Sequence, residues 1–325
     1  MTDKDDVLRL EELKVHYPVR LGHGFTQGAL KAVDGVDLTI GRGECLGLVG
    51  ESGCGKSSLA QAVMGLVPIT SGRIELTGRE DWRDDMLARA RTVQMVFQDP
   101  FSSLNPRQTI GQSLAGPLKL HGFSNRSERE DRVAEMLRKV GLNPDAAKRH
   151  PHEFSGGQRQ RICIARALIV EPKLVVCDEP VSALDVSIRA QIINLLLQLK
   201  DELGVALLMI SHDLGVVEHM SDRIAVMYLG RIVEEGGWRD IFTAPAHPYT
   251  RTLIASIPDP TRPADSWERL QGETPSALNP PAGCAFHPRC SRAFGPCTGG
   301  TVPGFTPLTE GHRARCHLLT QGEPA

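Results

Sequence analysis

The chain has 325 residues, of which 41% are hydrophobic and 23% are charged, and this is the composition of a globular protein with a hydrophobic core. A formal net charge of −2 argues against a nucleic-acid partner that is held by bulk electrostatic attraction. No apolar run approaches the roughly 20 residues that span a bilayer, and the acidic residues 1–6 lack the apolar stretch of a signal peptide, so a cytoplasmic protein is expected.

The first quarter of the chain predicts a β-rich layer and a short buried strand ahead of a glycine-rich loop. Apolar and polar residues alternate over residues 7–17 and 29–40, as they do in half-buried strands. A short apolar strand at residues 46–49 enters the loop, and residues 59–66 have the pattern of a helix that leaves it. One more short strand is predicted at residues 72–76.

Strands and helices alternate through the middle of the chain. The predicted elements are a strand at 91–97, helices at 110–120, 127–140 and 159–170, a strand at 173–177, a helix at 188–203 and a strand at 205–210. This alternation predicts an α/β fold with a mainly parallel sheet and with ligands at the carboxyl ends of the strands. The helices within about residues 99–170 are predicted to form a helical insertion, and the proline-rich chain after about residue 237 is expected to be irregular.

A phosphate-binding loop is predicted at Gly50-Glu51-Ser52-Gly53-Cys54-Gly55-Lys56-Ser57-Ser58, which fits the pattern of a glycine, four residues and Gly-Lys-Ser. Glycines let the backbone turn tightly enough to point N–H groups at phosphate oxygens, and the following helix adds a favourable dipole. Lys56 can reach the β- and γ-phosphates, and the Ser57 hydroxyl can ligate Mg²⁺. The alternative is a plain glycine-rich turn, but the strand before the loop and the helix after it favour a nucleotide site.

Two adjacent carboxylates follow the buried strand that ends at residue 177. Asp178 is placed to hold Mg²⁺ directly or through water, and Glu179 can polarise the water that attacks the γ-phosphate. A surface turn is the alternative, because Asp-Glu-Pro is turn-like. The phosphate-binding loop elsewhere in the chain favours the catalytic interpretation.

A second anion site is predicted at Ser155-Gly156-Gly157-Gln158-Arg159, where serine and glycines open a helix. An ordinary serine N-cap is the alternative. Because the first loop already provides one phosphate cradle, a second one suggests a nucleotide that another subunit presents. The sequence therefore predicts a dimer with ATP between the partners.

Together these motifs resemble those of the ATP-binding cassette (ABC) ATPases, in the family's order along the chain. Ser155–Gln158 matches the signature motif, and residues 182–185 match the D-loop, which ends at Asp185. The resemblance implies that Gln98 approaches Mg²⁺ and the γ-phosphate, that His212 contacts the γ-phosphate and that Tyr17 stacks on adenine. It also implies a P-loop NTPase core with an amino-terminal antiparallel β layer.

The resemblance thus assigns a role to each predicted site residue. Catalytic roles fall to Glu179, His212 and Gln98, and Mg²⁺ ligation falls to Ser57, Gln98 and Asp178. The ATP ligands within one chain are Tyr17, Gly50, Glu51, Ser52, Gly53, Cys54, Gly55, Lys56, Ser57, Ser58 and Gln98. The residues that act on the partner's ATP are Ser155, Gly156, Gly157, Gln158, Arg159 and Asp185. Since none of the expected catalytic residues is replaced, a competent ATPase is expected.

Further stretches resemble one branch of the family, the oligopeptide/dipeptide importer ATPases, and are most similar to OppF/DppF-type subunits. They are residues 30–36, 97–107, 180–187 and 247–250, together with the cysteine-rich end. The resemblance implies a cassette over residues 1–240, with the helical subdomain at about 99–170, and an extension over residues 241–325. It implies a peripheral protein on the cytoplasmic face of the membrane, with permease coupling helices received near residues 98–107.

The implied partners are a second ATPase subunit of OppD/DppD type, two transmembrane permeases and an extracytoplasmic binding protein. Relatives of this type also carry nickel, glutathione and other small solutes, so these remain alternative substrates. A soluble ABC ATPase that acts on DNA or ribosomes, or a module that holds ATP without hydrolysing it, would be alternatives of another class. The first usually carries a coiled-coil insertion or a second cassette, and the second would be expected to lack Glu179 or His212.

Eight cysteines divide into two groups. Those at Cys45, Cys54, Cys163 and Cys177 are expected to be buried structural thiols. The others, Cys284, Cys290, Cys297 and Cys316, crowd into the proline-rich end, where four thiolates could hold tetrahedral zinc or an iron–sulfur cluster. Resemblance to the importer extension favours a [4Fe–4S] cluster, while nearby histidines leave Zn²⁺ open and unligated thiols are a further alternative.

Overall fold

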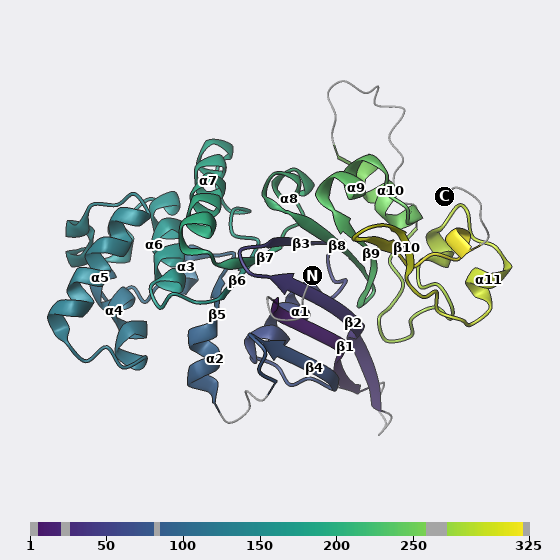
Figure 1. The fold of residues 1–325 in the computed structure, drawn as a ribbon, viewed down its shortest axis with the longest axis horizontal. Coiled ribbons are helices and arrows are strands. Elements are labelled where there is room, and N and C mark those ends of the chain that lie inside the picture. Colours follow the sequence, from purple (N-terminus) through teal and green to yellow (C-terminus); the bar gives the residue numbers. More distant parts are fainter. Residues whose placement is uncertain (1–5, 21–26, 81–84, 258–271, 321–325) are drawn as a thin grey trace. The chain divides into compact units, whose positions relative to one another are not determined.

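The computed structural model describes residues 6–20, 27–80, 85–257 and 272–320 (Figure 1). The chain divides into two compact units. We call one the helical unit, which comprises Met1–Arg9, Thr39–Cys45 and Glu75–Ile210. The other is the loop unit, which comprises Leu10–Leu38, Leu46–Ile74 and Ser211–Ala325 and carries the glycine-rich loop.

Three parallel strands form the sheet of the helical unit. They are β5 (Val93–Val96), β6 (Leu174–Asp178) and β7 (Ala206–Ile210), with β6 between the other two. Residues 174–177 of β6 and all of β7 are buried, as expected for strands of a parallel sheet that is covered on both faces. The carboxyl ends of β6 and β7 are in register, with Asp178 opposite Ile210.

Helices make up most of the helical unit. They are α2 (Met86–Thr92), α3 (Pro100–Ser103), α4 (Ile110–Leu120), α5 (Arg126–Lys139), α6 (Gly156–Leu168) and α7 (Val186–Leu203), with 3-10 turns at Pro144–Lys148 and Pro151–Glu153. Among them, α4, α5 and α6 pack together (Figure 1). The predicted helical insertion is therefore present, and capping boxes fix the first turns of α4 and α6.

Mixed pairing characterises the strands of the loop unit. Strand β3 (Cys45–Val49) is parallel to β8 (Arg223–Tyr228), and β9 (Arg231–Gly237) runs antiparallel to β8. The late strands β10 (Thr306–Thr309) and β11 (His312–Ala314) extend this arrangement, because β11 pairs antiparallel with β9 and β10 with β11. Strand β11 is therefore paired with a strand that lies some 80 residues earlier in the chain (Figure 1).

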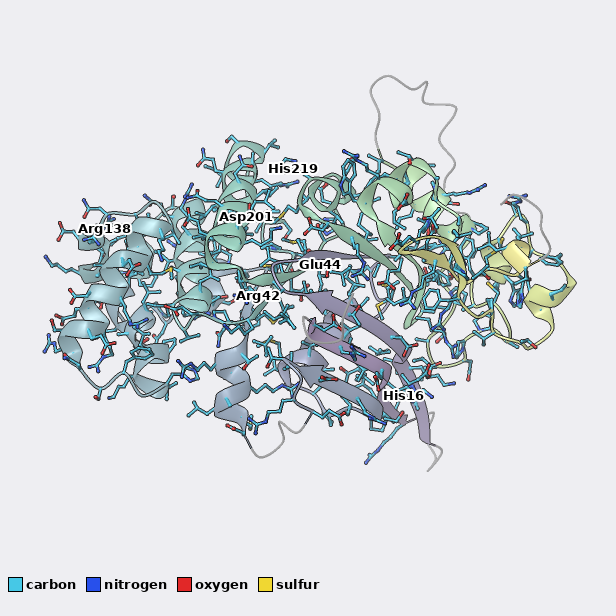
Figure 2. The ribbon with its side chains drawn as sticks, viewed as in Figure 1. His16, Arg42, Glu44, Arg138, Asp201 and His219 are labelled. Carbon is cyan, nitrogen blue, oxygen red and sulfur yellow. The ribbon has the colours of Figure 1, made fainter. Side chains whose placement is uncertain are left out.

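A three-stranded sheet in the order β2-β1-β4 accounts for the predicted β layer. Its strands are β1 (Asp6–Arg20), β2 (Gln27–Gly41) and β4 (Ser71–Leu76). A polar network ties β1 and β2 to β9. His16 on β1 (Figure 2) lies 3.0 Å from the Asp34 carboxylate, which also accepts a 2.7 Å hydrogen bond from Arg231. Burial opposes ionisation of Asp34, but these hydrogen bonds outweigh it and lower its pKa.

Short helices complete the loop unit. They are α1 (Lys56–Met64), α8 (Leu214–Met220), α9 (Trp238–Thr243), α10 (Pro248–Ala255) and α11 (Gly295–Thr298), with 3-10 turns at His287–Arg289 and His317–Thr320. Across residues 6–20, 27–80, 85–257 and 272–320, no helix is long and apolar enough to cross a membrane.

Three expectations need correction. The strand predicted at 91–97 begins at Val93, because residues 86–92 form α2. The helix predicted at 159–170 begins at Gly156, where Ser155 caps it. The chain after residue 237 is less irregular than its prolines suggest, since it forms α9, α10, β10 and β11; Pro258, Pro260 and Pro263 lie outside the described residues.

The four cysteines that were expected to be structural are buried. Burial raises the pKa of the Cys163 thiol to about 11 and raises that of Cys177 further. Both thiols are therefore protonated at neutral pH. The burial of all four cysteines agrees with their prediction as buried structural thiols.

Candidate nucleotide site

The glycine-rich loop follows the fully buried strand β3 and has a backbone that requires glycine. Gly50 and Gly55 have φ angles of 153° and 113°, which side-chain-bearing residues rarely adopt. A Cβ atom on Gly50 would lie 2.2 Å from the Met227 carbonyl oxygen, and one on Gly55 would lie 2.0 Å from that of Ala32. The loop thus runs too close to neighbouring backbone to admit a side chain at either position.

Lys56 is buried beneath the loop although it is charged. Its side chain turns back, and Nζ donates to the carbonyl oxygens of Gly50 at 2.7 Å and Glu51 at 2.9 Å. Nζ also lies 3.6 Å from the Cys54 sulfur, and burial raises the pKa of that thiol although Lys56 opposes the shift. The ammonium group is therefore held within the loop, where a phosphate group would meet it.

The start of α1 is open to an anion. Its N-cap residue, Gly55, has no side chain to accept a hydrogen bond from the first turn. Ser57 is exposed in that turn, and Tyr17 Oη donates to Ser58 Oγ at 3.4 Å. Tyr17 therefore lies beside the end of the loop, and its predicted contact with adenine stays a prediction.

Glu179 has a strained backbone at the end of β6 in the helical unit. Its φ angle is 49°, in the left-handed region, although it is not glycine. Its N–H donates to Ile210 O at 2.8 Å, and its carbonyl oxygen accepts hydrogen bonds from the N–H and hydroxyl groups of Ser182 at 3.3 and 3.1 Å. These bonds hold the strained conformation. Strain of this kind is concentrated at functional sites.

The structure brings Gln98 and Glu179 together, although 81 residues separate them. Gln98 Nε2 donates to Glu179 Oε2 at 3.0 Å. The half-buried Asp178 precedes Glu179 as the last residue of β6. Two of the three predicted catalytic residues are therefore in contact within one unit.

The stretch Ser155–Gln158 forms a capping box at the start of α6. The Gln158 N–H donates to Ser155 Oγ at 3.4 Å, and the Ser155 N–H donates to Gln158 Oε1 at 3.1 Å. Both side chains are exposed. A Cβ atom on Gly157 would lie 2.5 Å from Ile188 Cγ2, so this glycine lets α6 approach α7 closely.

The remaining predicted residues sit at element ends. Arg159 Nε donates to Phe154 O at 3.0 Å, and its guanidinium lies 4.3 Å from the centre of the exposed Phe101 ring. Asp185 is the exposed N-cap residue of α7, and its side chain makes no capping hydrogen bond. His212 is exposed two residues after β7. The roles predicted for these three residues stay predictions.

Three contacts to the loop were not predicted. Tyr249, Thr274 and Arg289, all in the C-terminal region (residues 241–325), make hydrogen bonds with Glu51. Tyr249 lies in the stretch at residues 247–250 that indicated the importer branch, but nothing in that stretch indicated a contact with the loop. No local sequence signal marks Arg289.

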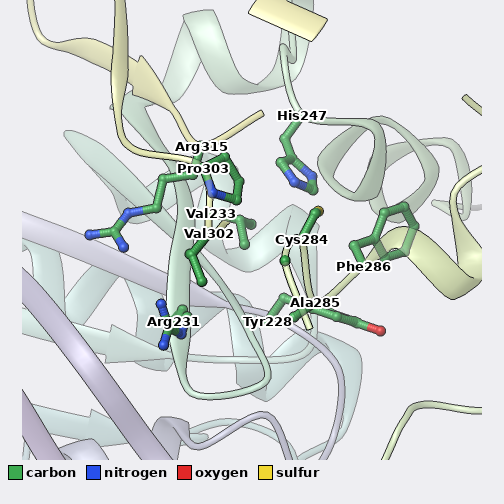
Figure 3. Close-up of a pocket in the computed structure, with 11 residues that line it drawn as sticks. Tyr228, Arg231, Val233, His247, Cys284, Ala285, Phe286, Val302, Pro303 and Arg315 are labelled. Carbon is green, nitrogen blue, oxygen red and sulfur yellow. The ribbon is translucent and has the colours of Figure 1, made fainter. Parts of the chain in front are cut away.

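The loop unit contains a small cavity that is lined by none of the residues of this loop. It is lined by residues such as Tyr228, His247, Cys284 and Phe286 (Figure 3). Its volume is about 30 Å³, which is room for one or two water molecules. Because ligand pockets are about ten times larger or more, this cavity does not compete as the nucleotide site.

The four cysteines of the C-terminal region lie close enough to influence one another. The Cys284 N–H donates to Cys297 O at 3.0 Å, and burial, followed by the other three thiols, raises the pKa of Cys284 to about 11. Among the described residues, however, no group of three or more His, Cys, Asp or Glu side chains is arranged to hold a metal ion. The predicted cluster therefore stays a prediction.

Family comparison agrees with the motifs in both regions of the chain. The family model described as "ABC transporter" matches residues 33–182, and the one described as "Oligopeptide/dipeptide transporter, C-terminal region" matches residues 233–297. Among solved structures, cbiO1 from Clostridium perfringens, part of an ABC transporter complex, aligns with a TM-score of 0.64 and 29% identity over 74% of this chain and 92% of that chain. A dimeric ATP-binding cassette bound to ADP and phosphate aligns with a TM-score of 0.62 and 29% identity, over 71% and 99% of the two chains.

Similarity to curated relatives extends over nearly the whole chain. The oligopeptide transport ATP-binding protein OppF of Escherichia coli K12 is 49% identical over 95% of each chain. The dipeptide transport ATP-binding protein DppF of the same strain is 48% identical over 91% of this chain and 90% of its own length. The oligopeptide transport ATP-binding protein AppF of Bacillus subtilis 168 is 46% identical over 98% and 99%. With the phosphate-binding loop, the signature stretch and the C-terminal region all matched, the chain belongs to the ABC transporter ATP-binding proteins, in the branch that includes OppF, DppF and AppF.

Proposed function

We propose that this protein is the ATP-hydrolysing subunit of an ABC importer that takes up oligopeptides or dipeptides. The observation that carries the ATPase assignment is the hydrogen bond between Gln98 and Glu179, made where Glu179 has a strained backbone. The names of the OppF, DppF and AppF relatives support peptide as the cargo. The protein would act at the cytoplasmic face of the cell's inner membrane as a peripheral subunit.

The loop residues suit the binding of ATP. The N–H groups of the loop and the ammonium group of Lys56 would neutralise the phosphate charge, and Tyr17 would stack on adenine. Mg²⁺, when bound with ATP, would offset negative charge on the β- and γ-phosphates. We assign Ser57, Gln98 and Asp178 as its ligands, because hydroxyl, amide and carboxylate oxygens are what Mg²⁺ prefers.

Hydrolysis would depend on Glu179 as the residue that orients and deprotonates the attacking water. Gln98 donates to one carboxylate oxygen of Glu179, which would keep this carboxylate in place to accept the proton of a water molecule. His212 would contact the γ-phosphate. On the nucleotide of a partner ATPase subunit, the N-terminus of α6 at Ser155–Gln158 would act together with Arg159 and Asp185.

Phe101 links a proposed permease contact to the signature helix. This ring is 59% exposed, on α3, and it stacks under the guanidinium of Arg159 in the first turn of α6. Arg166 of α6 also donates to the carbonyl oxygen of Ser103. A permease coupling helix that pushed on α3 would therefore move α6, which supports energy transfer through the helical unit.

The proposed assembly contains a second ATPase subunit of OppD/DppD type, two permeases and an extracytoplasmic binding protein. We assign residues 1–240 to the cassette, with the helical subdomain at about 99–170, and residues 241–325 to the extension. The Cys284 N–H donates to Cys297 O at 3.0 Å, and the other three thiols add to the burial that raises the pKa of Cys284. This proximity supports a shared site, for which we propose a [4Fe–4S] cluster, with Zn²⁺ as the alternative. Anaerobically purified protein should be brown and contain about four iron and four sulfide ions; a colourless protein with stoichiometric zinc would reject the cluster.

The Glu179→Gln variant of the assembled transporter tests the catalytic assignment. We expect ATP turnover to fall by about 10²–10⁴-fold while ATP still binds, because a general base contributes this much. Glu171→Gln is the matched control, since Glu171 also has a positive φ angle, is exposed and precedes the same strand. Turnover near the wild-type rate in Glu179→Gln would reject Glu179 as the base. Uptake of a labelled dipeptide, compared with uptake of nickel and glutathione, tests the cargo.

A further inference from the structure

Every polar group of Glu51, the second residue of the phosphate-binding loop, has a partner. Its N–H donates to Tyr249 Oη at 2.9 Å, and its carbonyl oxygen accepts from Lys56 Nζ at 2.9 Å. Its carboxylate accepts two hydrogen bonds from Arg289, at 2.6 and 3.0 Å, and one from the Thr274 hydroxyl at 3.3 Å. Three of these four partners come from the C-terminal region, and Arg289 lies 238 residues away along the chain.

The ion pair between Arg289 and Glu51, which joins the C-terminal region to the loop, is largely buried. The Arg289 side chain is only 4% exposed and that of Glu51 23%. Two parallel hydrogen bonds between a guanidinium and a carboxylate fix orientation as well as distance. The bonds to Glu51 raise the pKa of Arg289 further, so the guanidinium stays charged. Loss of the carboxylate would leave a buried, charged guanidinium without its main partner.

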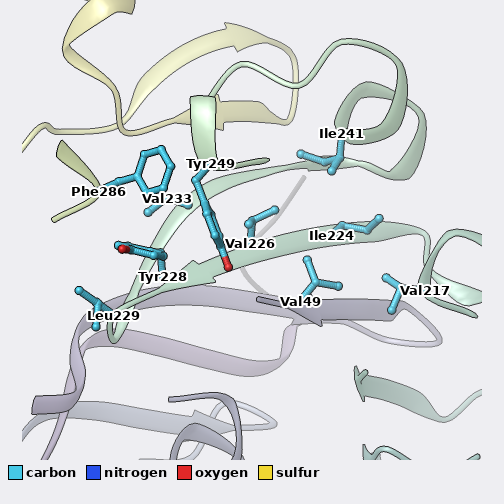
Figure 4. Packing of buried hydrophobic residues seen from close by; sticks show 10 residues of the cluster. All are labelled: Val49, Val217, Ile224, Val226, Tyr228, Leu229, Val233, Ile241, Tyr249 and Phe286. Atoms are coloured by element: carbon cyan, nitrogen blue, oxygen red, sulfur yellow. The ribbon is translucent and has the colours of Figure 1, made fainter. Parts of the chain in front are cut away.

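An aromatic cluster fixes the segment that carries Arg289. Phe286, which begins the turn that ends at Arg289, packs against Tyr228 and Tyr249 with ring centres 5.3 and 5.4 Å apart (Figure 4). The same cluster includes Val49, the last residue of β3 before the loop. Tyr249 and the segment that carries Arg289 therefore pack on the same hydrophobic core as the strand that leads into the loop.

We propose that Arg289 and Tyr249 are positioning residues that hold the phosphate-binding loop in its ATP-binding form, so that the C-terminal region sets the affinity for ATP. The inference rests on the proposed function of the loop. Its physical basis is preorganisation, since a loop that is already ordered loses less entropy when it binds phosphate. Lys56 takes part, because Glu51 supplies one of the carbonyl oxygens that hold its ammonium group.

Equilibrium titration of the full-length chain with a fluorescent ATP analogue and Mg²⁺ tests the proposal. We expect Arg289→Gln to raise the Kd about tenfold and Tyr249→Phe about fivefold, in line with the loss of a charge-assisted and a neutral hydrogen bond. Arg292→Gln is the matched control, because Arg292 is exposed in the same segment, and its Kd should equal that of the wild type. In the assembled transporter, the same variants should raise the KM for ATP while kcat changes less.

A double-mutant cycle isolates the pair. Glu51→Gln combined with Arg289→Gln should weaken binding by less than the product of the two single effects, because each removes the same bond. Tyr249→Phe keeps the packed ring, so it carries the test if Arg289→Gln does not fold. Variants that melt at lower temperature but bind with the wild-type Kd would show a merely structural role and overturn the proposal. Absence of binding by the wild type would instead refute the proposed function.

Discussion

Glycines of the phosphate-binding loop differ in whether a Cβ atom would fit. Comparing them distinguishes the cost of a strained φ angle from the cost of a steric clash. Gly53 and Gly55 both have positive φ angles, of 79° and 113°. A Cβ atom on Gly53 would meet nothing within 4 Å, whereas one on Gly55 would lie 2.0 Å from Ala32 O. Only the second position requires glycine for space as well as for conformation.

We therefore predict unequal effects of the same substitution at these two positions. Gly55→Ala should lower the stability of the chain by about 3 kcal/mol or more and abolish detectable ATP binding, because the loop must move away from Ala32. Gly53→Ala, the matched control, should cost only about 1 kcal/mol of conformational strain. Chemical denaturation and nucleotide titration measure both effects. Equal losses in the two variants would contradict the steric argument.

At the residue scale, local motifs could be predicted and remote partners could not. Lys56 and Glu179 were found because their chemistry needs a fixed local pattern of neighbours, whereas Gln98 was assigned through the resemblance to the ABC ATPases. The contact between Gln98 and Glu179 follows from a sheet in which β5 and β6 are adjacent and parallel, so their carboxyl ends meet. Arg289 has no such local pattern, because it meets Glu51 only after Phe286, three residues earlier, has packed against the core.

Elements of the chain were predicted where they bury a periodic apolar face. Helix α4 has the bounds predicted, and it buries Ile110, Leu114 and Leu118 at helical spacing. Helix α2 was missed, because it buries no residue and so carries no such pattern. Strands β10 and β11 are four and three residues long, too short for the alternation of apolar and polar residues to identify them.

The contact between α6 and α7 gives a prediction about the signature stretch. Gly157→Ala should push α6 away from Ile188, which lies 2.5 Å from the added Cβ atom, and should reduce both stability, by about 1–3 kcal/mol, and ATPase activity. Gly156→Ala is the matched control for stability, since its Cβ atom would lie at an ordinary 3.8 Å from Leu184. Combining Gly157→Ala with Ile188→Ala should restore part of the stability. If the double variant is no better than the sum of the single ones, the clash is not the cause.

The N-cap of α10 provides a pH-dependent prediction. His247 accepts the Tyr249 N–H at Nδ1, and burial lowers its pKa to about 4, although Glu234 opposes the shift. The unfolded chain, with an ordinary histidine pKa near 6.5, binds a proton between pH 6.5 and 4 that the folded chain does not. Stability from this group is therefore complete above pH 6.5 and decreases as the pH falls, by about 3 kcal/mol in total.

Replacing His247 with asparagine should flatten this decrease, because the amide oxygen can still accept the Tyr249 N–H but does not titrate. Denaturant unfolding of wild type and His247→Asn at pH 7, 5.5 and 4.5 measures the difference. His219→Asn, on an exposed residue of α8 (Figure 2), should follow the wild-type profile. Parallel pH profiles for wild type and His247→Asn would contradict the assignment.

On the scale of the whole molecule, the C-terminal region completes the loop unit and is not a separate appendage. The fully buried Glu234 of β9 accepts hydrogen bonds from the N–H groups of Ala246 and His247 and from the imidazole of His312 on β11. Burial alone would raise the pKa of Glu234, but these bonds lower it. Composition suggested an irregular segment here because prolines disrupt regular elements, but composition alone does not indicate which strand a short segment will pair with.

A chain that ends at residue 257 should therefore fold poorly. This truncation removes the His312 hydrogen bond to Glu234, the pairing of β11 with β9 and the Phe286 ring of the aromatic cluster. Burial of one such ring alone is worth about 3–5 kcal/mol. We expect this truncation to aggregate in size-exclusion chromatography, whereas a chain that ends at residue 320 should elute like the full-length protein. A monomeric, cooperatively unfolding product of the shorter truncation would show that the C-terminal region is dispensable.

Pairing between β9 and β11 also sets the order of events while the protein is being made. Glu235 of β9 bonds to Arg313, and 78 residues separate the two. At ordinary rates of synthesis, about 4–16 s pass between their appearances. During that interval the edge of β9 is unpaired, and an open strand edge is where nascent chains associate with one another. Synthesis of β11 therefore sets the time at which the edge of β9 is covered. We expect chaperones to bind the nascent chain mainly in the interval before that.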